Sequence, residues 1–388
     1  MNKFNLMGPG SQSGIIPFGE NEFYRAYTKN TGNMLFYYAC ERLVDLDPKR
    51  YGWGGAANEI NTFSKGLVLP LSNQIGKHFN LGLSGPRISG LAIPIVALGL
   101  GAQEIFSESN FQLIPSESID WLRLLADSTR TVNIAVRGAN TYSYMERIGI
   151  ATSVKILGCP SLLINPAKKL GMNIKERYDT ELKSGTFSRF ISVAAGDPYN
   201  KDVLVVQFER NLLSIVDSYD ATYVVQNPDI LIKLTTKWYG SLSQPEYQLL
   251  AKKFFINYSN HEVDLWFRRH ALTFFSVPSW IYYYSNRSLV IGTRIHGIQA
   301  AIQAGTPAIC FCIDARTKEL CEIMKLPHAL ASDFASGLNL EDCRRILDEW
   351  DANAFDLNRQ RLALETKRFL VENGVSYKTD TILSYVDV

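Results

Sequence analysis

Short apolar runs alternate along this chain with segments whose apolar residues recur at helical spacing. Such runs are typical of parallel strands, which are covered on both faces. Glycine and polar residues separate the two kinds of segment, as expected of turns. We therefore predict an α/β fold. The expected strands cover residues 93–98, 132–136, 154–157, 203–208, 223–225, 254–257, 289–291 and 308–313, and the expected helices cover 33–43, 117–125, 141–147, 263–270, 298–304 and 340–370.

The alternation is interrupted once, at residues 168–189, which are charged and polar with weak apolar periodicity. We interpret this segment as an interdomain linker. A chain of 388 residues is long enough for two domains with separate cores. We predict two Rossmann-like domains, residues 1–180 and 181–388, that face each other across a cleft. The helical C-terminal stretch could cross back to the first domain.

Residues 51–70 are rich in Gly, Asn, Ser and Thr and predict an irregular loop, with Trp53 at the edge of the cleft. Trp53 and Trp238 are weaker candidates for contact with a substrate. The aromatic cluster 280–284 could stack on a sugar, although a packed face is the more common use of such residues. The histidines other than His296 are expected to be structural or solvated. They are His78, His261, His270 and His328.

Composition and charge restrict the classes of partner. The apolar and charged fractions, 46% and 20%, are those of an ordinary soluble protein, and a net charge of +2 gives no reason to expect nucleic acid. The longest apolar stretch, 91–102, is shorter than the roughly 20 residues of a membrane span, and residues 1–16 lack the features of a secretory signal. We expect a cytoplasmic protein that could work beside the inner membrane. The oligomeric state cannot be read from these features.

The six cysteines are scattered and include no C-x-x-C pair. This spacing favours neither a zinc site nor a disulfide framework, so we expect reduced thiols. The cysteines are Cys40, Cys159, Cys310, Cys312, Cys321 and Cys343.

The junction after the predicted strand 289–291 contains the strongest chemical signal. Arg294 and His296 lie where this strand gives way to a helix. The N–H groups and dipole of a helix N-terminus favour an anion, and a guanidinium suits phosphate or carboxylate. His296 is a plausible proton donor. Taken alone, the motif is equally compatible with an ion pair at Arg294 and a capping role for His296.

The wider sequence resembles the C-terminal signature of the polysaccharide pyruvyl transferase family. The matching elements are the strand, Gly292-Thr-Arg-Ile-His-Gly297, an Ala-rich helix, Ala304-Gly-Thr-Pro307, an apolar strand and Asp314. Asn30-Thr-Gly-Asn33, Pro94–Gly101 and Val136-Arg-Gly138 are also similar to family motifs. The resemblance implies a GT-B-like fold and transfer of a pyruvyl unit from phosphoenolpyruvate onto two hydroxyls of a sugar. It implies no metal and no cofactor besides this donor substrate.

Site residues follow from the same resemblance. His296 would be the acid/base and Arg294 the phosphate clamp, and Arg210 would end the first strand of the second domain and bind the donor. Arg316 and Lys318 compete for one further donor position. The full donor set is Arg210, Arg294, Ile295, His296, Gly297 and Lys318, and the implied acceptor set is Asn30, Gly32, Asn33, Gly99, Gly101 and Arg137.

The implied acceptor is a sugar or glycan of a surface or exopolysaccharide pathway, either free, lipid-linked or polymeric. Asn33 stands where many family members have Asp, so the identity of the sugar stays open. One alternative is a metal-independent GT-B glycosyltransferase with a nucleotide-sugar donor, for which Asp314 or Glu319 could bind the ribose. A second alternative is a non-catalytic family member that binds glycans.

Overall fold

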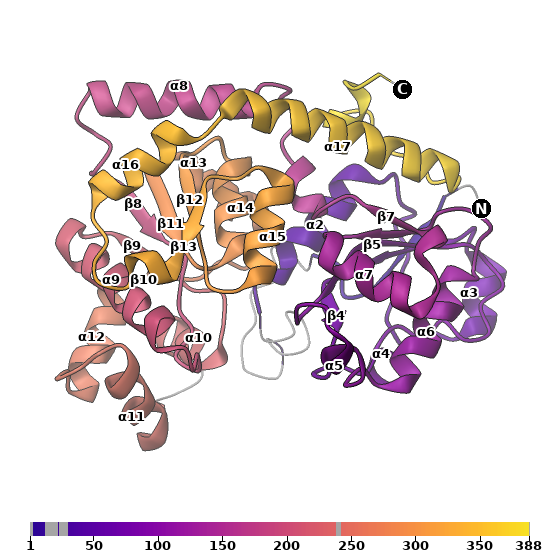
Figure 1. Cartoon of the computed structure of the whole chain (residues 1–388), viewed down its shortest axis with the longest axis horizontal. Coiled ribbons are helices and arrows are strands. Elements are labelled where there is room, and N and C mark those ends of the chain that lie inside the picture. The colour runs from indigo at the N-terminus through magenta and orange to yellow at the C-terminus, as the bar shows by residue number, and fades with distance from the viewer. Residues whose placement is uncertain (1–2, 12–21, 23–29, 238–241, 388) are drawn as a thin grey trace.

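The computed structural model describes residues 3–11, 22, 30–237 and 242–387, and it contains two parallel β-sheets flanked by helices (Figure 1). The first sheet has the order β2-β1-β3-β5-β6-β7, with β4 paired to β5. The second has the order β10-β9-β8-β11-β12-β13. Numbered along the chain, the second order is 3-2-1-4-5-6, that of a Rossmann sheet. The predicted α/β class with two parallel-sheet halves is confirmed.

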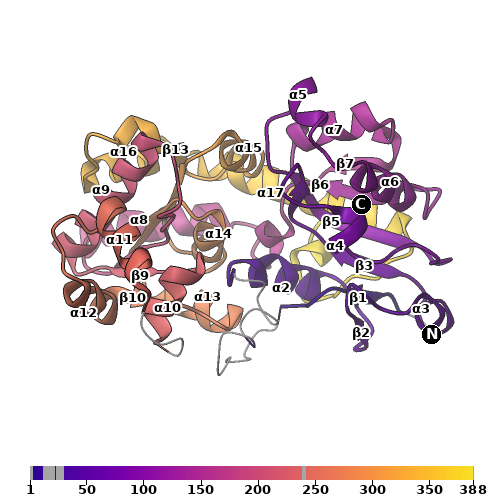
Figure 2. The ribbon, with the colours of Figure 1, turned by 90° about the horizontal axis from the view of Figure 1, so that it is seen from below.

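The first half lies at the right of Figure 1 and contains the segments up to η2. Its strands are β1 (Asn5–Met7), β2 (Arg50–Tyr51), β3 (Leu67–Pro70), β4 (Asn73–Ile75), β5 (Ile95–Ala102), β6 (Ile134–Val136) and β7 (Val154–Ile156). Its helices are α2 (Asn33–Leu43), α3 (Ala57–Phe63), α4 (Leu81–Ser84), α5 (Glu108–Phe111), α6 (Ser116–Ala126), α7 (Ala139–Ile148), and the 3₁₀ turns η1 (Ala151–Ser153) and η2 (Pro160–Leu163). Figure 2 shows α2 between the two sheets, beside α13 and α14.

The second half begins after α8 (Leu170–Lys183). Its strands are β8 (Ile191–Val193), β9 (Thr222–Val224), β10 (Ala271–Leu272), β11 (Leu289–Gly292), β12 (Ala308–Cys312) and β13 (His328–Leu330). Its helices are α9 (Val203–Tyr219), α10 (Asp229–Thr236), α11 (Gln244–Lys253), α12 (Asn260–His270), α13 (Val277–Ser285), α14 (Ile295–Gln303), α15 (Ala315–Met324), α16 (Leu340–Glu349) and α17 (Ala352–Glu372), with the 3₁₀ turns η3 (Ala331–Phe334) and η4 (Ile382–Ser384).

The predicted strand 203–208 is wrong, because this run forms the start of α9. The Asp202 side chain accepts hydrogen bonds from the backbone N–H groups of Leu204 and Val205, which caps a helix. A short apolar run does not by itself distinguish a buried helix from a buried strand. The first strand of the second sheet is β8, which was not predicted. The predicted strand 254–257 is also wrong, because Phe254 is the C-cap of α11 and the run forms turns after that helix.

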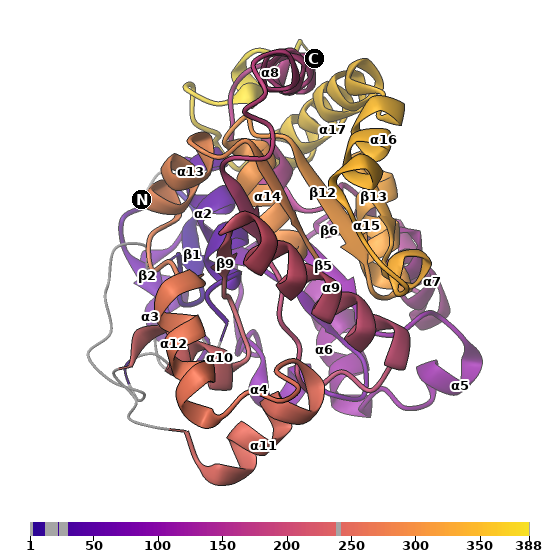
Figure 3. The same ribbon diagram turned by 90° about the vertical axis from the view of Figure 1, so that its left-hand side faces the viewer.

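The predicted irregular loop 51–70 is also wrong. It contains α3 and the fully buried β3, which pairs with β1 and β5. The predicted linker 168–189 contains α8, a packed helix with buried apolar residues on one face. Its buried face rests against α17, and the two helices lie side by side in Figures 1 and 3. The expected domain boundary after residue 180 falls inside α8 and stays a prediction.

The C-terminal segment crosses back to the first half, as the sequence suggested. α17 runs from the second half toward the first (Figure 1), where Glu365 forms an ion pair with Lys155. Beyond the helix, the Asn373 amide donates to the Val132 carbonyl at 2.8 Å, and Asp380 pairs with Arg42 at 2.7 Å. These contacts fix the two halves relative to each other. No helix among the described residues is long and apolar enough to cross a membrane.

Candidate functional site

A cavity of about 500 Å³ lies between the two halves, and we call it the interdomain cleft. Polar residues that follow β5, β6, β9 and β11 contribute to its lining, because the carboxyl ends of parallel strands open toward the same side of a sheet. In the second sheet, β8 and β11 are neighbours at the point where the strand order reverses. α14 begins at this point, which is where open α/β sheets bind ligands.

Arg294 is the N-cap of α14 and lines the cleft. One of its terminal nitrogens donates to the Gly196 carbonyl, while its Nε has no partner among the described residues. A buried carboxylate supports this turn: Glu209 accepts from the Thr293 hydroxyl at 2.6 Å and from the Gly196 N–H at 3.0 Å. This network therefore holds Arg294 at the helix N-terminus and leaves its Nε donor without a partner among the described residues.

His296 lies in the first turn of α14 and lines the same cleft. Its Nε2 is buried and has no partner within the described chain, although the residue as a whole is only partly buried. Burial, together with the positive charges of Arg137 and Arg316, lowers the pKa of His296 to about 3. The imidazole of the unliganded cleft is therefore neutral at neutral pH, and its protonation depends on what neutralises the two arginines.

The depressed pKa predicts how stability depends on pH. The unfolded chain binds a proton on His296 near its ordinary pKa of 6.5, whereas the folded chain does not until about pH 3. The contribution to stability is therefore complete above pH 6.5 and is lost as the pH falls toward 3, by at most about 1.4 kcal/mol per pH unit. Calorimetric melting from about pH 7 to about pH 4 should show a steeper loss for wild type than for His296→Asn. Parallel curves would contradict the depressed pKa.

Arg137 and Arg316 come from opposite halves and line the same cleft, and the positive charge of each lowers the pKa of His296. Arg137 follows β6 and is only 6% exposed. It donates to the Gly99 carbonyl at 2.8 Å and to Asn73 at 3.0 Å, which leaves one terminal nitrogen unpartnered among the described residues. Arg316, on α15, donates to Gln103 of the first half at 3.3 Å. The two guanidinium groups thus meet across the cleft.

The cleft presents many hydrogen-bond donors and few negatively charged acceptors. No Asp or Glu is among the described residues that line it. Buried nitrogens without a hydrogen-bond partner in the described chain are found on Trp53, Arg137, Gln226, Arg294, His296 and Arg316. Buried polar atoms without a partner are rare in native proteins, so their concentration here indicates a ligand that supplies acceptors. Arg316 pairs with Asp314 at 2.9 Å, outside the lining, so the positive charge of the lining is offset in part and the donors that remain favour an acceptor-rich or anionic ligand.

The predicted donor residues divide into two groups. Ile295 lines the cleft beside Arg294 and His296, and the buried Gly297 allows Gln226 to approach α14 closely, since a Cβ there would lie 2.6 Å from its amide nitrogen. Arg210 is placed elsewhere: it lies on α9 and donates to the Lys252 and Lys253 carbonyls. The error arose from the mistaken strand 203–208.

Lys318 is exposed and pairs with Glu322 on its own helix. Arg316, which competed with it for one donor position, lines the cleft. The two side chains are two residues apart on α15, so they lie on different faces of the helix. The sequence could not decide which face meets the cleft, because that depends on the packing of α15 against α7 of the other half.

Among the predicted acceptor residues, Asn30, Asn33 and Arg137 line the cleft. The three predicted glycines lie close to residues of the cleft and leave room for them. Gly32 lies against His296, because a Cβ there would be 3.3 Å from its Nδ1. Gly99 has a positive φ of 80° and supplies the carbonyl that holds Arg137, and a side chain at Gly101 would meet Asn73 and Arg137. Arg137 therefore lies among the cationic residues that surround His296.

Sequence reasoning missed several lining residues. Gln103 and Gln226 each follow a buried strand, so polar residues at strand ends could have identified them. His78 was expected to be structural or solvated but lines the cleft, and no sequence signal marks it. Trp53 lines the cleft as suggested, whereas Trp238 lies outside the described residues. The aromatic cluster 280–284 forms α13, whose Trp280 and Tyr284 are buried in the core.

Comparisons with solved structures give distant similarities. A Staphylococcus aureus MnaA–UDP structure is 13% identical, with a TM-score of 0.44 and coverage of 96% of this chain and 97% of that one. UDP-N-acetylglucosamine 2-epimerase from Rickettsia bellii is 12% identical, with a TM-score of 0.45 and 96% coverage of both chains. An α,α-trehalose-phosphate synthase from Burkholderia vietnamiensis is 10% identical, with a TM-score of 0.39 and coverage of 92% and 78%. We draw no functional conclusion from similarities this distant.

A search of curated proteins finds no significant match. The family model of polysaccharide pyruvyl transferases, in contrast, matches residues 30–312. The matched region begins at the Asn30 loop, ends with β12 and includes both Arg137 and His296. It is well over half of the chain, and this chain therefore belongs to the polysaccharide pyruvyl transferase family.

Proposed function

We propose that the interdomain cleft binds phosphoenolpyruvate and transfers its pyruvyl group to two hydroxyls of a sugar. The observation that carries this proposal is the set of three arginines around His296, each with a buried nitrogen that has no partner among the described residues. One of them, Arg316, is also paired with Asp314 at 2.9 Å, which lies outside the lining. Phosphoenolpyruvate carries a phosphate and a carboxylate on the same carbon, so a ligand of this kind matches several guanidinium groups at once. We further propose a surface or exopolysaccharide as the destination, which the family name supports.

The donor would be held from both halves. Within the described chain, Arg137 and Arg316 offer unpartnered nitrogens from opposite sides, and Arg294 offers a third beside the N-terminus of α14. A helix N-terminus and charge-assisted hydrogen bonds are both favourable to phosphate. Because one arginine belongs to the first half and two to the second, donor binding would also hold the two halves together.

Bound donor would change the protonation of His296. The charges of Arg137 and Arg316 contribute to its low pKa in the unliganded cleft. A trianionic donor between these arginines offsets their charge, so the pKa of His296 rises on binding and the imidazole takes up a proton. His296 would thus become an acid when its substrate is present, which places its proton next to the donor rather than in the empty site.

The first step forms one carbon–oxygen bond. Protonated His296 gives its proton to the methylene carbon of phosphoenolpyruvate, and the C2 centre becomes oxocarbenium-like. A sugar hydroxyl then attacks C2 and transfers its own proton to the neutral His296. General acid–base catalysis of this kind contributes typically about 10²- to 10⁴-fold. The product of the step is a tetrahedral centre that still carries the phosphate.

The second step closes the ketal. The bond between C2 and the phosphate oxygen breaks, the electron pair leaves with the phosphate, and the second hydroxyl attacks C2. The proton of that hydroxyl is taken up by the released phosphate. The arginines stabilise the charge that develops on the leaving group, as fixed cationic groups do in other phosphate-releasing sites. Of the two protons lost by the sugar, one therefore replaces the proton that His296 gave to the methyl group, and the other is on phosphate.

The first half supplies a surface suited to the sugar. Trp53 and Phe79 line the cleft with ring centroids 6.3 Å apart, and Asn73 and Gln74 offer amides nearby. Aromatic faces stack on the apolar side of sugar rings, and amides bond to hydroxyls in both directions. The acceptor would therefore enter from the first half and meet the donor at His296.

Turnover provides the test of this proposal. The protein is incubated with phosphoenolpyruvate and a panel of hexoses, hexosamines and oligosaccharides, and released phosphate is measured. We expect phosphate release only when an acceptor with two suitably placed hydroxyls is present, together with a new ketal methyl signal by proton NMR. Glycosyl transfer from a nucleotide sugar, with no use of phosphoenolpyruvate, would contradict the proposal.

A further inference from the structure

Three buried cysteines converge behind the cleft, in the second half. Cys310 and Cys312 are two positions apart on β12, so their side chains lie on one face of the sheet, and Cys321 of α15 packs over that face. Their exposures are 0%, 3% and 0%. The three sulfurs lie within 4.8 Å of one another, with 3.9 Å between the Sγ atoms of Cys312 and Cys321.

These separations are close to those of a metal thiolate site. A zinc–sulfur bond is about 2.3 Å, so two sulfurs on one tetrahedral or trigonal ion are roughly 3.8 to 4.0 Å apart. The Cys312–Cys321 pair already has this spacing, and the other pairs need at most about 1 Å of adjustment. The thiols are thus placed around a common point without a change in the backbone of β12 or α15.

A histidine lies on the neighbouring strand, outside the group of three sulfurs. β13 pairs in parallel with β12, and His328 is the register partner of Cys310, so both side chains extend from the same face of the sheet. The Nδ1 of His328 is 2.8 Å from the Leu326 carbonyl. When Nδ1 carries the proton and donates to that carbonyl, Nε2 is the basic nitrogen that a metal uses.

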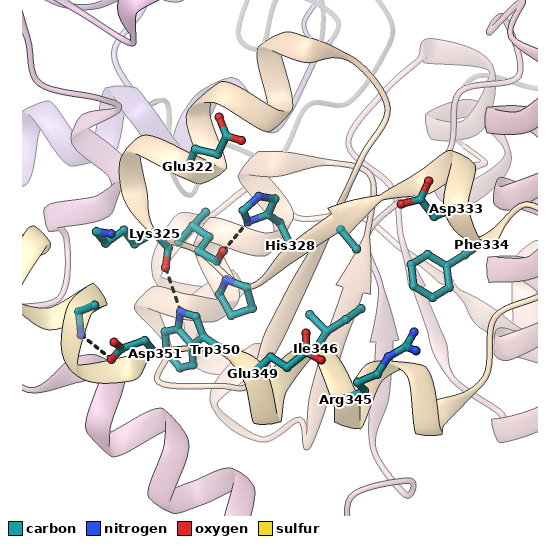
Figure 4. A pocket seen from close by; sticks show the side chains of 14 residues that line it. Glu322, Lys325, His328, Asp333, Phe334, Arg345, Ile346, Glu349, Trp350 and Asp351 are labelled. Atoms are coloured by element: carbon teal, nitrogen blue, oxygen red, sulfur yellow. Dashed lines mark hydrogen bonds between the residues drawn. The ribbon is translucent and has the colours of Figure 1, made fainter.

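His328 also lines an open cavity of about 810 Å³ between β13, α15 and α16 (Figure 4). Figure 4 labels His328 and Glu322, the residue after Cys321, among the side chains that line this cavity. His328 therefore lines this cavity and is at the same time the register partner of Cys310 on β12.

We propose that Cys310, Cys312 and Cys321 bind one thiophilic divalent cation of the zinc type, and that the ring of His328 turns toward the three sulfurs to become the fourth ligand. Binding releases three thiol protons and leaves a site with a net charge of −1. The ion connects α15 to β12 and β13, and α15 carries Arg316 into the interdomain cleft. Its role is structural, since the site has no position on the cleft itself. The spacing along the sequence gave no sign of it, because the third cysteine comes from a helix.

Buried cysteine is often only a small apolar residue, so metal retention must be measured directly. The full chain is treated with chelator and reductant, loaded separately with Zn²⁺ and Cd²⁺, and passed through gel filtration in metal-free buffer. We expect one equivalent of either ion to remain, with thiolate-to-metal ultraviolet absorption for Cd²⁺. A wild-type protein that retains no metal above the background of a cysteine-poor reference protein would overturn the proposal without any variant.

Variants assign the ligands. Cys312→Ser should weaken Cd²⁺ binding by about tenfold or more and reduce the thiolate absorption, and His328→Ala should weaken binding while keeping that absorption. Cys343→Ser is the matched control, because Cys343 is equally buried but lies on α16 outside the cluster. Equal loss in Cys343→Ser would overturn the assignment to these thiols, and unchanged affinity in His328→Ala would overturn the fourth ligand.

Discussion

Replacing His296 with alanine should reduce turnover by about 10²- to 10⁴-fold while phosphoenolpyruvate still binds. The imidazole lies at the start of α14 in the lining of the cleft and is the group assigned to proton transfer at the methylene carbon. The arginines that bind the donor remain in the variant, so the dissociation constant for phosphoenolpyruvate should change by less than a few fold. Steady-state phosphate release gives the turnover, and calorimetric titration gives the affinity.

The matched control is His261→Ala, because His261 is exposed at the start of α12 and does not line the cleft. Its turnover should equal that of wild type. If His296→Ala turned over normally with a competent acceptor, the proton transfer would have to be assigned to another group. Loss of donor affinity comparable to the loss of turnover would instead make His296 a binding residue.

Replacing Arg316 with glutamine should weaken phosphoenolpyruvate binding by roughly 10- to 100-fold. Hydrogen bonds to charged groups contribute about 1.5–3 kcal/mol, and the loss of one such interaction corresponds to that range. Arg316 lines the cleft, bonds to Gln103 across it and retains a buried unpartnered Nε among the described residues. Lys318→Gln removes the same charge from the exposed side of the same helix and should change the affinity by no more than about twofold.

Calorimetric titration of both variants tests this difference directly. A larger effect at Lys318 than at Arg316 would mean that α15 presents its other face to the donor, which the structure does not support. Equal effects would indicate a general dependence on net charge instead of a defined contact, and raising the ionic strength would then abolish both.

Local features of the site were predictable from sequence. The turn from β11 to α14 is encoded within a few residues, because an apolar run, a Gly-Thr break and an Ala-rich helix follow one another directly. The positions of Arg294 and His296 follow from this order alone. Helix α2 was predicted with its observed bounds for the same reason, since its periodicity is local.

Features that depend on long-range packing were not predictable. Arg137 and Arg316 are far apart in sequence and meet because α7 and α15 pack across the two halves. Arg210 was misplaced because the buried face of α9 reads as an apolar run. The convergence of Cys321 on β12 likewise depends on how α15 is laid over the second sheet.

The most direct test of the proposed donor site is the melting temperature of wild type and Arg294→Ala with phosphoenolpyruvate, pyruvate and a panel of nucleoside diphosphates. A ligand that binds only the native state raises the melting temperature according to its affinity and concentration. We expect a rise with phosphoenolpyruvate alone, absent in Arg294→Ala. A rise with a nucleoside diphosphate and none with phosphoenolpyruvate would contradict the proposed donor and indicate a nucleotide-sugar enzyme.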